Sequence, residues 1–398
     1  MMYITPVVPA SGNIALSSEL LGKAERLIAS SAKLTGGHNA YFMGAVRDLL
    51  RITNSYYSNL IESEGTHPID IERAMQKDFF QDDKKKNLQL LSLAHIDVQR
   101  YIEKSLGSQE SLYSAHTLLE IHKRFYSKKE MQFALHIEHG NQMATIVPGK
   151  IRDGEVKVGA HIAPKAKELP AYLNEFETLY NQSHAQTKTI RLIYALCSHH
   201  RLVYIHPFFD GNGRISRLYL DHLLFGIGLE GYGLWNISRG LAREQEKYRA
   251  HLARADEPFL GEYNNGRGAL SLKGLRAFAN FMLDTALDQV EYMTELLKID
   301  NIASRINSYV HFSRQNMYLD IDPLPKHAEV IFQALLLHGQ IPRNSIKDII
   351  RTSKPTAIKV VRELERREYL TSEEPKSPIR IKLNAHFASE IIPQLIGK

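Results

Sequence analysis

Apolar residues recur every three or four positions along most of the chain, which is the spacing of amphipathic helices. This pattern predicts several helices over residues 16–104, including AYFMGAVRDLLRITNSYYSNLIES and NLQLLSLAHIDVQRYIEKSL. Another helix is expected near residues 110–127, and the spacing resumes in LPAYLNEFETLYN and TIRLIYALCSHHRLVYIHPF. The chain is therefore expected to be mainly α-helical.

The stretch that precedes LPAYLN is the least helical part of the chain. ATIVPGKIRDGEVKVGAHIAP contains a Pro-Gly pair and then an Asp-Gly pair, Asp153–Gly154, between short β-prone segments. Such turn residues between short β-prone segments are typical of a β-hairpin. We predict one small hairpin over residues 150–162, with the Asp-Gly pair as a turn.

Two interruptions divide the C-terminal third of the chain. One is polar and glycine-rich near residues 261–274, and the other is irregular and ends near residues 320–326. After it, HAEVIFQALLLHG, NSIKDIIRTSKPTAIKVVRELERREYL and PIRIKLN predict three helices and a hairpin. This order is the outline of a winged helix-turn-helix.

Charge distinguishes that last segment from the rest of the chain. The net charge is +6, and residues 326–398 hold 13 basic and 8 acidic side chains against 37 and 36 elsewhere. Nucleic acid is therefore a candidate partner for this segment alone. Glu363, Glu365 and Glu368 are interspersed among its cations, so a solvated face is the competing interpretation.

Other sequence features exclude several classes of protein. No window approaches the roughly 18 apolar residues that a membrane helix needs, and the first residues do not resemble a signal peptide. A single cysteine, Cys197, excludes an internal disulfide framework. We expect a cytoplasmic protein without a membrane partner.

The string HPFFDGNGRISRLYLDHLL, from His206, carries the clearest chemistry. Pro207, Gly211 and Gly213 interrupt the preceding helix, and a new helix is expected from about Asn212 to Gly226. The N-terminus of that helix would present free backbone N–H groups and the positive end of a dipole to an anion.

Charged side chains around this loop suit a phosphate ligand. Arg214 and Arg217 project from one face of the new helix and can grip phosphate oxygens, while Asp210 suits Mg²⁺. His206 has the ordinary pKa of a general base. An ordinary turn followed by two solvated arginines is the competing interpretation of the same residues.

HPFFDGNGRISR resembles the signature of the Fic family, HxFx(D/E)GNGRxxR, at every specified position. The resemblance implies transfer of AMP from ATP to a Ser, Thr or Tyr hydroxyl of a protein. In that scheme His206 takes the proton of the hydroxyl and Asp210 holds Mg²⁺ against the phosphates. The phosphate-binding residues would be Gly211, Asn212, Gly213, Arg214 and Arg217.

The same resemblance suggests two further subsites. The hairpin over residues 150–162 stands where the family has a flap that pairs with the target backbone. The flap residues would be Val158, Gly159, Ala160 and His161. Asn236 and Tyr248 resemble the adenine-side segment, although a core tyrosine is an equal alternative for the latter.

SNLIESEG, from Ser58, resembles the inhibitory segment [S/T]xxxE[G/N] of the family. Ser58 and Glu62 share a helical face at i and i+4, and the resemblance implies that Glu62 pairs with Arg217 and makes ATP bind unproductively. Ser63 stands where Gly or Asn is expected. Glu64 is therefore a rival for the inhibitory role, although the residue four before it, Leu60, breaks the pattern.

The expected fold is a Fic-type helical bundle with a small β-hairpin flap and a C-terminal winged helix-turn-helix domain. The expected regions are an N-terminal helical region (1–105, with the inhibitory helix at about 40–65), a catalytic core (106–260), a helical connector (261–325) and the winged domain (326–398).

The expected function is that of a protein adenylyltransferase that uses ATP with Mg²⁺, is autoinhibited by Glu62, and acts on an unknown protein or on itself. De-AMPylation at the same site and a DNA-binding regulator that senses a nucleotide are the alternatives. Transfer of UMP or phosphocholine and a homodimeric state stay open, and DNA is a candidate partner of residues 326–398.

Overall fold

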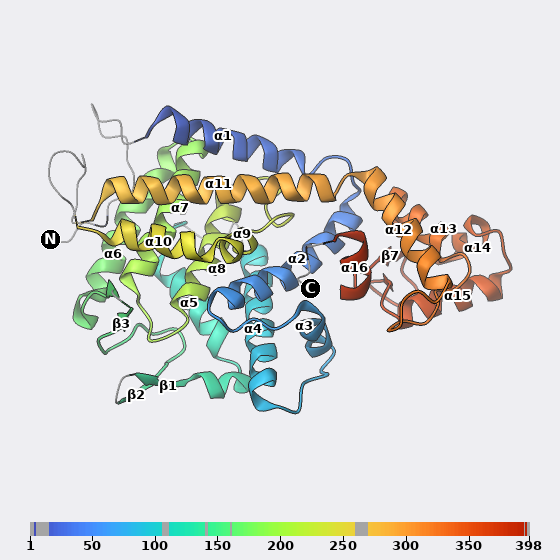
Figure 1. Cartoon of the computed structure of the whole chain (residues 1–398), viewed down its shortest axis with the longest axis horizontal. Coiled ribbons are helices and arrows are strands. Elements are labelled where there is room, and N and C mark those ends of the chain that lie inside the picture. Colours follow the sequence, from blue (N-terminus) through green and yellow to red (C-terminus); the bar gives the residue numbers. More distant parts are fainter. Residues whose placement is uncertain are drawn as a thin grey trace.

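The computed structural model describes residue 4 and residues 16–105, 111–139, 142–159, 161–258, 270–393 and 395. Helices form most of the described structure, as the spacing of apolar residues predicts. The chain builds an elongated molecule with a large main body and a smaller C-terminal lobe at one end (Figure 1). We use the name C-terminal lobe for residues 328–395.

Four helices form the first part of the described chain, and three of them have an N-cap that the sequence provides. The four helices are α1 (Ser18–Lys33), α2 (Ala40–Ile61), α3 (Pro68–Met75) and α4 (Asp83–Ser105). The side chains of Ser17, Asn39 and His67 each accept a hydrogen bond from a backbone N–H in the first turn of the helix that follows. Helix α2 packs against α4 and α9, and its C-terminus thereby reaches the centre of the main body.

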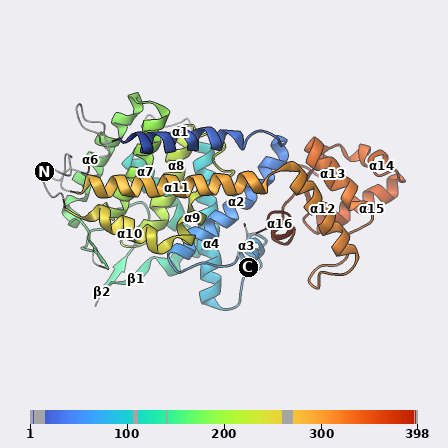
Figure 2. The same cartoon turned by 45° about the horizontal axis from the view of Figure 1, so that its top comes forward.

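The central helices enclose the HPFFDGNGR loop. They are α5 (Ala115–Tyr126), α6 (Leu169–Asn181), α7 (Lys188–Ile205), α8 (Asn212–Gly226), α9 (Ile237–Arg243), α10 (Gln245–Asp256) and α11 (Leu272–Leu296). Helices α7 and α8 are largely buried and pack against each other, and the loop connects the two helices. Helices α1 and α11 run side by side along one side of the main body (Figures 1 and 2).

No helix in the described ranges is both long enough and apolar enough to cross a membrane.

The main body contains two short antiparallel hairpins. Strand β1 (His136–His139) pairs with β2 (Gln142–Thr145), and β3 (Lys157–Val158) pairs with β4 (His161–Ile162). The prediction of an Asp-Gly hairpin turn was wrong, because the second hairpin turns after Val158, where Gly159 has a φ of +60°. The first hairpin was not predicted at all.

The C-terminal elements are helices with three short strands among them. They are α12 (Ile299–Arg314), α13 (Ala328–His338), β5 (Gln340–Ile341), α14 (Ile346–Ile349), α15 (Lys354–Arg366), β6 (Leu370–Thr371), β7 (Ile379–Ile381) and α16 (Ala385–Ile391). Strand β7 lies between β5 and β6 in an antiparallel sheet. The side chain of Ser353 caps α15, and Pro355 lies in its first turn.

The C-terminal lobe is packed against the beginning of α2 and against α3. Asn39 donates a hydrogen bond from Nδ2 to the carbonyl of Leu336 at 2.8 Å, and the Arg380 guanidinium lies 4.3 Å from the centre of the Tyr41 ring. The backbone N–H of Ala385 donates to the Glu72 carboxylate at 2.8 Å. The beginning of α2 therefore touches the lobe, and near its other end the Tyr57 hydroxyl donates to the Leu395 carbonyl of the lobe at 3.4 Å.

Candidate active site

The loop between α7 and α8 is closed by its own side chains. His206 ends α7 with a φ of 50°, and Gly211 precedes α8 with a φ of +77°. The Asn212 side chain accepts a hydrogen bond from the Phe208 N–H at 2.9 Å and donates one to the Phe208 carbonyl at 2.8 Å. A Cβ at position 211 would lie 2.4 Å from the hydroxyl of Tyr126. Both the backbone angle and the space therefore require glycine there.

The first turn of α8 presents unpaired backbone donors. The first N–H of the helix with a backbone acceptor is that of Ile215, which bonds to the Gly211 carbonyl at 2.9 Å. Among the described residues, no acceptor is found for the backbone N–H groups of Asn212, Gly213 and Arg214. These groups and the helix dipole make the loop able to hold an anion.

His206 is half-buried beside this turn and has the properties of a general base. Its Nδ1 lies 3.4 Å from the Val203 carbonyl, which can only accept a hydrogen bond, so the ring proton belongs on Nδ1 and Nε2 keeps its lone pair. Burial, helped by the nearby His161 and Arg152, lowers the pKa of His206 to about 4, although the hydrogen bond to the Val203 carbonyl opposes the shift. The imidazole is therefore neutral at pH 7 and able to accept a proton.

Arg152 supports the loop from the far side and was not identified from the sequence. Its guanidinium donates to the carbonyls of His206 at 2.8 Å, Gly154 at 2.7 Å and Pro164 at 2.5 Å. Its backbone N–H also donates to the Pro207 carbonyl at 2.9 Å. These contacts join the base of the second hairpin to the backbone of His206, and they hold residues 152–154 away from any strand pairing.

Arg217 is turned toward the end of α2. Its Nε donates to the Ser58 hydroxyl at 2.9 Å and its Nη2 donates to the Ser58 carbonyl at 2.8 Å. The same Nη2 contacts the Glu62 carboxylate at 2.7 Å. Glu62 is the C-cap residue of α2, and its carboxylate lies against Gly213, where a Cβ would come within 2.1 Å of Oε1.

Arg214 is held by carboxylates on both sides. Its Nη1 contacts Glu64 at 2.5 Å and its Nη2 contacts Asp210 at 2.9 Å. Asp210 also accepts a hydrogen bond from the Tyr126 hydroxyl at 3.3 Å. The guanidinium of Arg214 is buried, and its Nε has no hydrogen-bond partner among the described residues. Glu62 and Glu64 together place two negative charges at the head of α8.

A cleft of about 270 Å³ collects these groups. It joins the end of α2, the strand β3 and the loop between α7 and α8. Its lining residues include His206, Asp210, Gly211, Asn212, Gly213, Arg214, Glu62, Glu64 and Val158. Arg217 lies behind Glu62 and is not part of the lining.

Helix α10 holds the end of α2 over this cleft. The Gln245 side-chain amide donates to the Ile61 carbonyl at 2.6 Å, and Arg249 donates to the same carbonyl at 3.2 Å. These two side chains satisfy a carbonyl that the end of a helix leaves unpaired.

The residues suggested for the flap differ in where they lie relative to the cleft. Val158 is half-exposed and lines the cleft, and Gly159 is exposed. His161 turns toward the main body, where its Nε2 lies 2.9 Å from the Tyr204 carbonyl and its Nδ1 lies 3.5 Å from Asp256. Ala160 lies outside the described residues.

The two residues suggested for the adenine side do not line the cleft. Asn236 caps α9 by accepting a hydrogen bond from the Arg239 N–H at 3.2 Å. Tyr248 is buried, with its hydroxyl 2.7 Å from His199 Nε2. Both have structural contacts that account for their burial.

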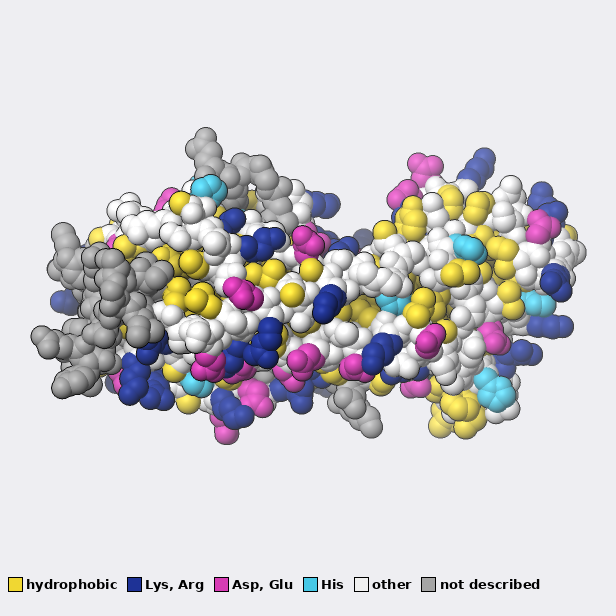
Figure 3. Space-filling model, turned by 90° about the horizontal axis from the view of Figure 1, so that it is seen from above, with side chains coloured by type: hydrophobic (Ala, Val, Ile, Leu, Met, Phe, Trp, Pro, Cys, Tyr) yellow, Lys and Arg dark blue, Asp and Glu magenta, His cyan; other side chains and the backbone are white. Residues whose placement is uncertain are grey.

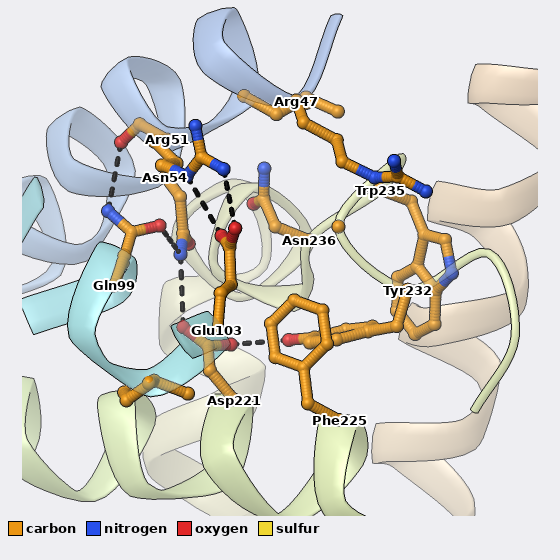
Figure 4. A pocket seen from close by; sticks show the side chains of 13 residues that line it. Arg47, Arg51, Asn54, Gln99, Glu103, Asp221, Phe225, Tyr232, Trp235 and Asn236 are labelled. Carbon is orange, nitrogen blue, oxygen red and sulfur yellow. Dashed lines mark hydrogen bonds and ion pairs between the residues drawn. The ribbon is translucent and has the colours of Figure 1, made fainter. Parts of the chain in front are cut away.

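Asn236 instead lines a small polar cavity of about 20 Å³ between α2, α4 and α8 (Figure 4). There the Asp221 carboxylate accepts hydrogen bonds from Asn54 at 3.1 Å and from the Tyr232 hydroxyl. Burial raises the pKa of Asp221 to about 7, although both hydrogen bonds oppose that shift. Asn54 precedes Ser58 by one helical turn, so this contact holds α2 on α8 next to Arg217.

The carboxylate that the cleft offers as a metal ligand fits a cation that is bound mainly by phosphate oxygens. No cluster of three or more His, Cys, Asp or Glu side chains in the described part of the chain could hold a metal ion alone. The contacts found for Asp210 are both at Oδ2, which leaves Oδ1 available as a ligand. Mg²⁺ in nucleotide sites is typically bound by one or two carboxylates together with phosphates and water.

Comparison with known proteins identifies the class to which this site belongs. Residues 113–224 match the family model described as "Fic/DOC family". This segment contains α5, both hairpins and the complete loop from His206 to Arg217. The chain therefore contains a Fic/DOC domain.

Individual relatives give the same assignment. The chain is similar to "Protein adenylyltransferase Fic" of Aedes aegypti, with 33% identity over 129 residues that make up 32% of this chain and 23% of the relative. The protein of the same name in Drosophila melanogaster is 34% identical over the same shares. The match thus spans less than a quarter of the length of these curated relatives.

Solved structures resemble this one over more of its length. A Fic family protein from Desulfovibrio desulfuricans G20 superimposes with a TM-score of 0.52 at 15% identity, covering 92% of this chain and 97% of the other. Fic-1 of C. elegans (aa134–508) gives a TM-score of 0.50 at 18% identity, covering 70% and 71%. At such identities the likeness establishes the fold alone.

Proposed function

We propose that this chain is a protein adenylyltransferase, which transfers AMP from ATP to a hydroxyl group of a protein. One observation carries the proposal: a neutral imidazole, three free backbone N–H groups and a buried arginine surround a single cleft. The names of the relatives matched by the Fic/DOC domain agree with it.

In the proposed reaction the target oxygen attacks the α-phosphorus of ATP. The bond from that phosphorus to the bridging oxygen of the β-phosphate breaks, and pyrophosphate leaves. The hydroxyl proton passes to His206 Nε2, which is neutral at pH 7 because burial lowers the pKa of His206 to about 4. The backbone N–H groups of Asn212 and Gly213 would stabilise charge on the phosphates as it develops.

Asp210 would hold Mg²⁺, which neutralises phosphate charge when it is bound. Arg214 would bind the terminal phosphates, since its guanidinium already faces carboxylate oxygens in the same place. Val158 and Gly159 are the residues of the hairpin whose exposure suits backbone pairing with a target.

The site as described would be autoinhibited. Glu62 contacts Arg217, and Glu64 contacts Arg214, so each motif arginine already has a carboxylate partner. Carboxylates resemble phosphates in charge and in their geometry toward arginine. Productive binding of the terminal phosphates of ATP would therefore require both carboxylates to be displaced.

Labelled ATP tests this function. The Glu62→Gly variant, which lacks the carboxylate on Arg217, is incubated with Mg²⁺ and either α-labelled or γ-labelled ATP. We expect label on the protein itself from α-labelled ATP only, and we expect its loss in Glu62→Gly/His206→Ala. His184→Ala is the matched control, because His184 is exposed on a short 3-10 helix, Gln182–Ala185.

Two results would contradict the proposal. Labelling from γ-labelled ATP would indicate phosphoryl transfer rather than AMP transfer. Equal labelling with and without His206 would remove the imidazole from the reaction.

A further inference from the structure

A long groove on the C-terminal lobe has no part in the chemistry described above. Its volume is about 1090 Å³, and it lies between α15, the start of α14 and the loop from β6 to β7. Five basic side chains and one carboxylate line it: Arg343, Lys347, Lys354, Arg362, Lys376 and Glu365. The groove is therefore strongly cationic.

One of these cations has a structural role. Arg343 donates to Glu365 at 3.1 Å, to the Ser372 hydroxyl at 2.9 Å and to the Ser377 carbonyl at 3.0 Å. These bonds fix the β6–β7 loop against α15 and neutralise the only carboxylate of the groove. The charges of the other four basic side chains remain.

Those remaining cations have few partners of their own. In the part of the chain that the structure describes, no carboxylate lies within ion-pair distance of Lys354, Arg362 or Lys376. Lys347 contacts only the exposed Asp348 at 3.5 Å, a kind of pair that contributes little. Elsewhere on the molecule, exposed lysines such as Lys247 and Lys298 pair with a glutamate three positions away. The groove thus carries positive charge that the protein does not neutralise.

The groove faces away from the rest of the molecule. Strand β7 and α16, on the other side of the lobe, pack against α2 and α3. Helices α14 and α15 lie at the outer end of the lobe (Figure 1), and basic side chains gather on that end of the surface (Figure 3). A large partner could therefore reach α15 without contacting the main body.

We propose that this groove and the exposed face of α15 bind double-stranded DNA. Helix α15 has 13 residues, begins with the exposed hydroxyls of Ser353 and Thr356, and exposes Lys354, Lys359 and Arg362. An α-helix fits the major groove of B-DNA, where hydroxyls and cations contact base edges, while flanking cations contact phosphates. The four cations of the groove that remain without neutralisation, Lys347, Lys354, Arg362 and Lys376, are placed for the phosphate contacts.

Other anionic partners fit this surface less well. The major groove of double-stranded RNA is too deep and narrow for a helix to enter. A membrane surface usually requires a broad apolar face in addition to cations, and the exposed face of α15 offers only Ile358, which is 42% exposed. In the major groove, an isolated apolar side chain can contact a thymine methyl group.

Fluorescence anisotropy with a labelled 30-base-pair duplex of mixed sequence tests the proposal. The full-length His206→Ala protein is used, so that no nucleotide transfer can alter the surface. Four phosphate contacts would lower affinity roughly 100-fold between 50 and 200 mM salt. The Lys354→Ala and Arg362→Ala variants should each bind more weakly, with a salt slope smaller by about one.

Charge reversal provides a sharper comparison. Lys354→Glu/Arg362→Glu should abolish binding, whereas Lys247→Glu/Lys298→Glu changes the net charge equally on the main body and should bind like the parent. Equal melting temperatures establish that each variant is folded. Binding would then depend on the position of the charges and not on their total.

Three outcomes would overturn the inference. The first is no binding of the duplex at 50 mM salt. The second is equal loss of affinity in the two charge-reversal variants. The third is tighter, groove-dependent binding of an RNA duplex of the same sequence, or of vesicles rich in anionic lipid, because the partner would then belong to another class.

Discussion

Removing the two carboxylates at the head of α8 should activate the protein by unequal amounts. Glu62 contacts Arg217 at 2.7 Å and Glu64 contacts Arg214 at 2.5 Å. Each contact would have to break before ATP could place its terminal phosphates in the site. The free energy of each contact therefore appears as a factor in the rate of AMP transfer at low ATP.

The sizes of the two effects follow from how far each glutamate side chain is exposed to water and from how deeply its arginine partner is buried. The Glu62 side chain is 34% exposed and bonds to a nearly fully buried guanidinium, so its charged hydrogen bond is worth about 2 kcal/mol. That free energy corresponds to a roughly 30-fold higher rate in Glu62→Gly. Glu64 is 42% exposed, and screening by water reduces its contact to about 1 kcal/mol, or roughly fivefold in Glu64→Gly.

The assay is the initial rate of self-labelling by α-labelled ATP, measured well below saturation for wild type, both single variants and the double variant. Melting temperatures are measured in parallel, because a partly unfolded protein can also expose the cleft. Two outcomes would refute this reasoning: rates equal to wild type in both single variants, or a larger gain in Glu64→Gly than in Glu62→Gly. The double variant should be at least as active as Glu62→Gly, with deviation from additivity because the two residues are adjacent.

Three further predictions concern His206, the arginine that supports its loop, and a buried carboxylate on α8. Because burial lowers the pKa of His206 to about 4, the rate of the Glu62→Gly variant should not change between pH 6 and 8, whereas an inflection near 6.5 would indicate a solvated imidazole. Arg152→Lys keeps the charge but loses the planar set of hydrogen bonds to three carbonyls. We therefore expect kcat to fall on the order of 10- to 100-fold, with the KM for ATP little changed. A higher KM for ATP with a normal kcat would contradict a positioning role. Burial raises the pKa of Asp221 to about 7, so the folded protein keeps a proton that the unfolded chain loses, and the free energy of unfolding falls as pH rises from about 4 to about 7. Thermal melts of Asp221→Asn should lack this contribution, and a wild-type pH dependence in that variant would show that Asp221 is ionised throughout.

The parts of the site that could be predicted from the sequence are the local ones. Pro207 and Gly211 interrupt a helical pattern within a few residues, so the loop and the start of α8 at Asn212 follow directly from the residues. The side-by-side placement of Ser58 and Glu62 follows from helical spacing in the same way. Local chemistry determines these features, and tertiary packing changes them little.

The contact between Glu64 and Arg214 could not be predicted from the sequence, because it depends on the backbone conformation of Ser63. Ser63 has a φ of 64°, a conformation that few residues other than glycine adopt. The chain therefore turns directly after the α2 C-cap, and Glu64 comes to face the cleft although it does not share the helical spacing of Ser58 and Glu62. A helical register extended through residue 64 cannot anticipate this turn.

At the second hairpin the sequence predicts a turn that the structure does not form. The Asp-Gly pair favours a hairpin turn, but tertiary contacts place the turn elsewhere. Asp-Gly pairs are common in hairpin turns, yet Arg152 ties the neighbouring backbone to His206 and Pro164. Gly159, five residues further on, supplies the positive φ angle that the turn needs. A buried arginine that bonds only to carbonyls leaves no pattern in the sequence, so neither its role nor its effect on the turn was predictable.

Helix α2 is the element that links the two ends of the molecule. Its 22 residues span about 33 Å, from the lobe contact of Asn39 to the contacts of Ser58 and Glu62 with Arg217. A helix resists bending because its hydrogen bonds are internal. The lobe also contacts α2 one residue before Ser58, where the Tyr57 hydroxyl donates to the Leu395 carbonyl at 3.4 Å, so a shift of the C-terminal lobe can reach α2 near both ends. If a duplex on α15 displaced the Glu62 contact, ATP would in turn strengthen duplex binding by the same factor, since coupling between two sites is reciprocal. Titrating each ligand in the presence of the other measures that factor, and a value of one would mean that a duplex on α15 leaves the Glu62 contact unchanged.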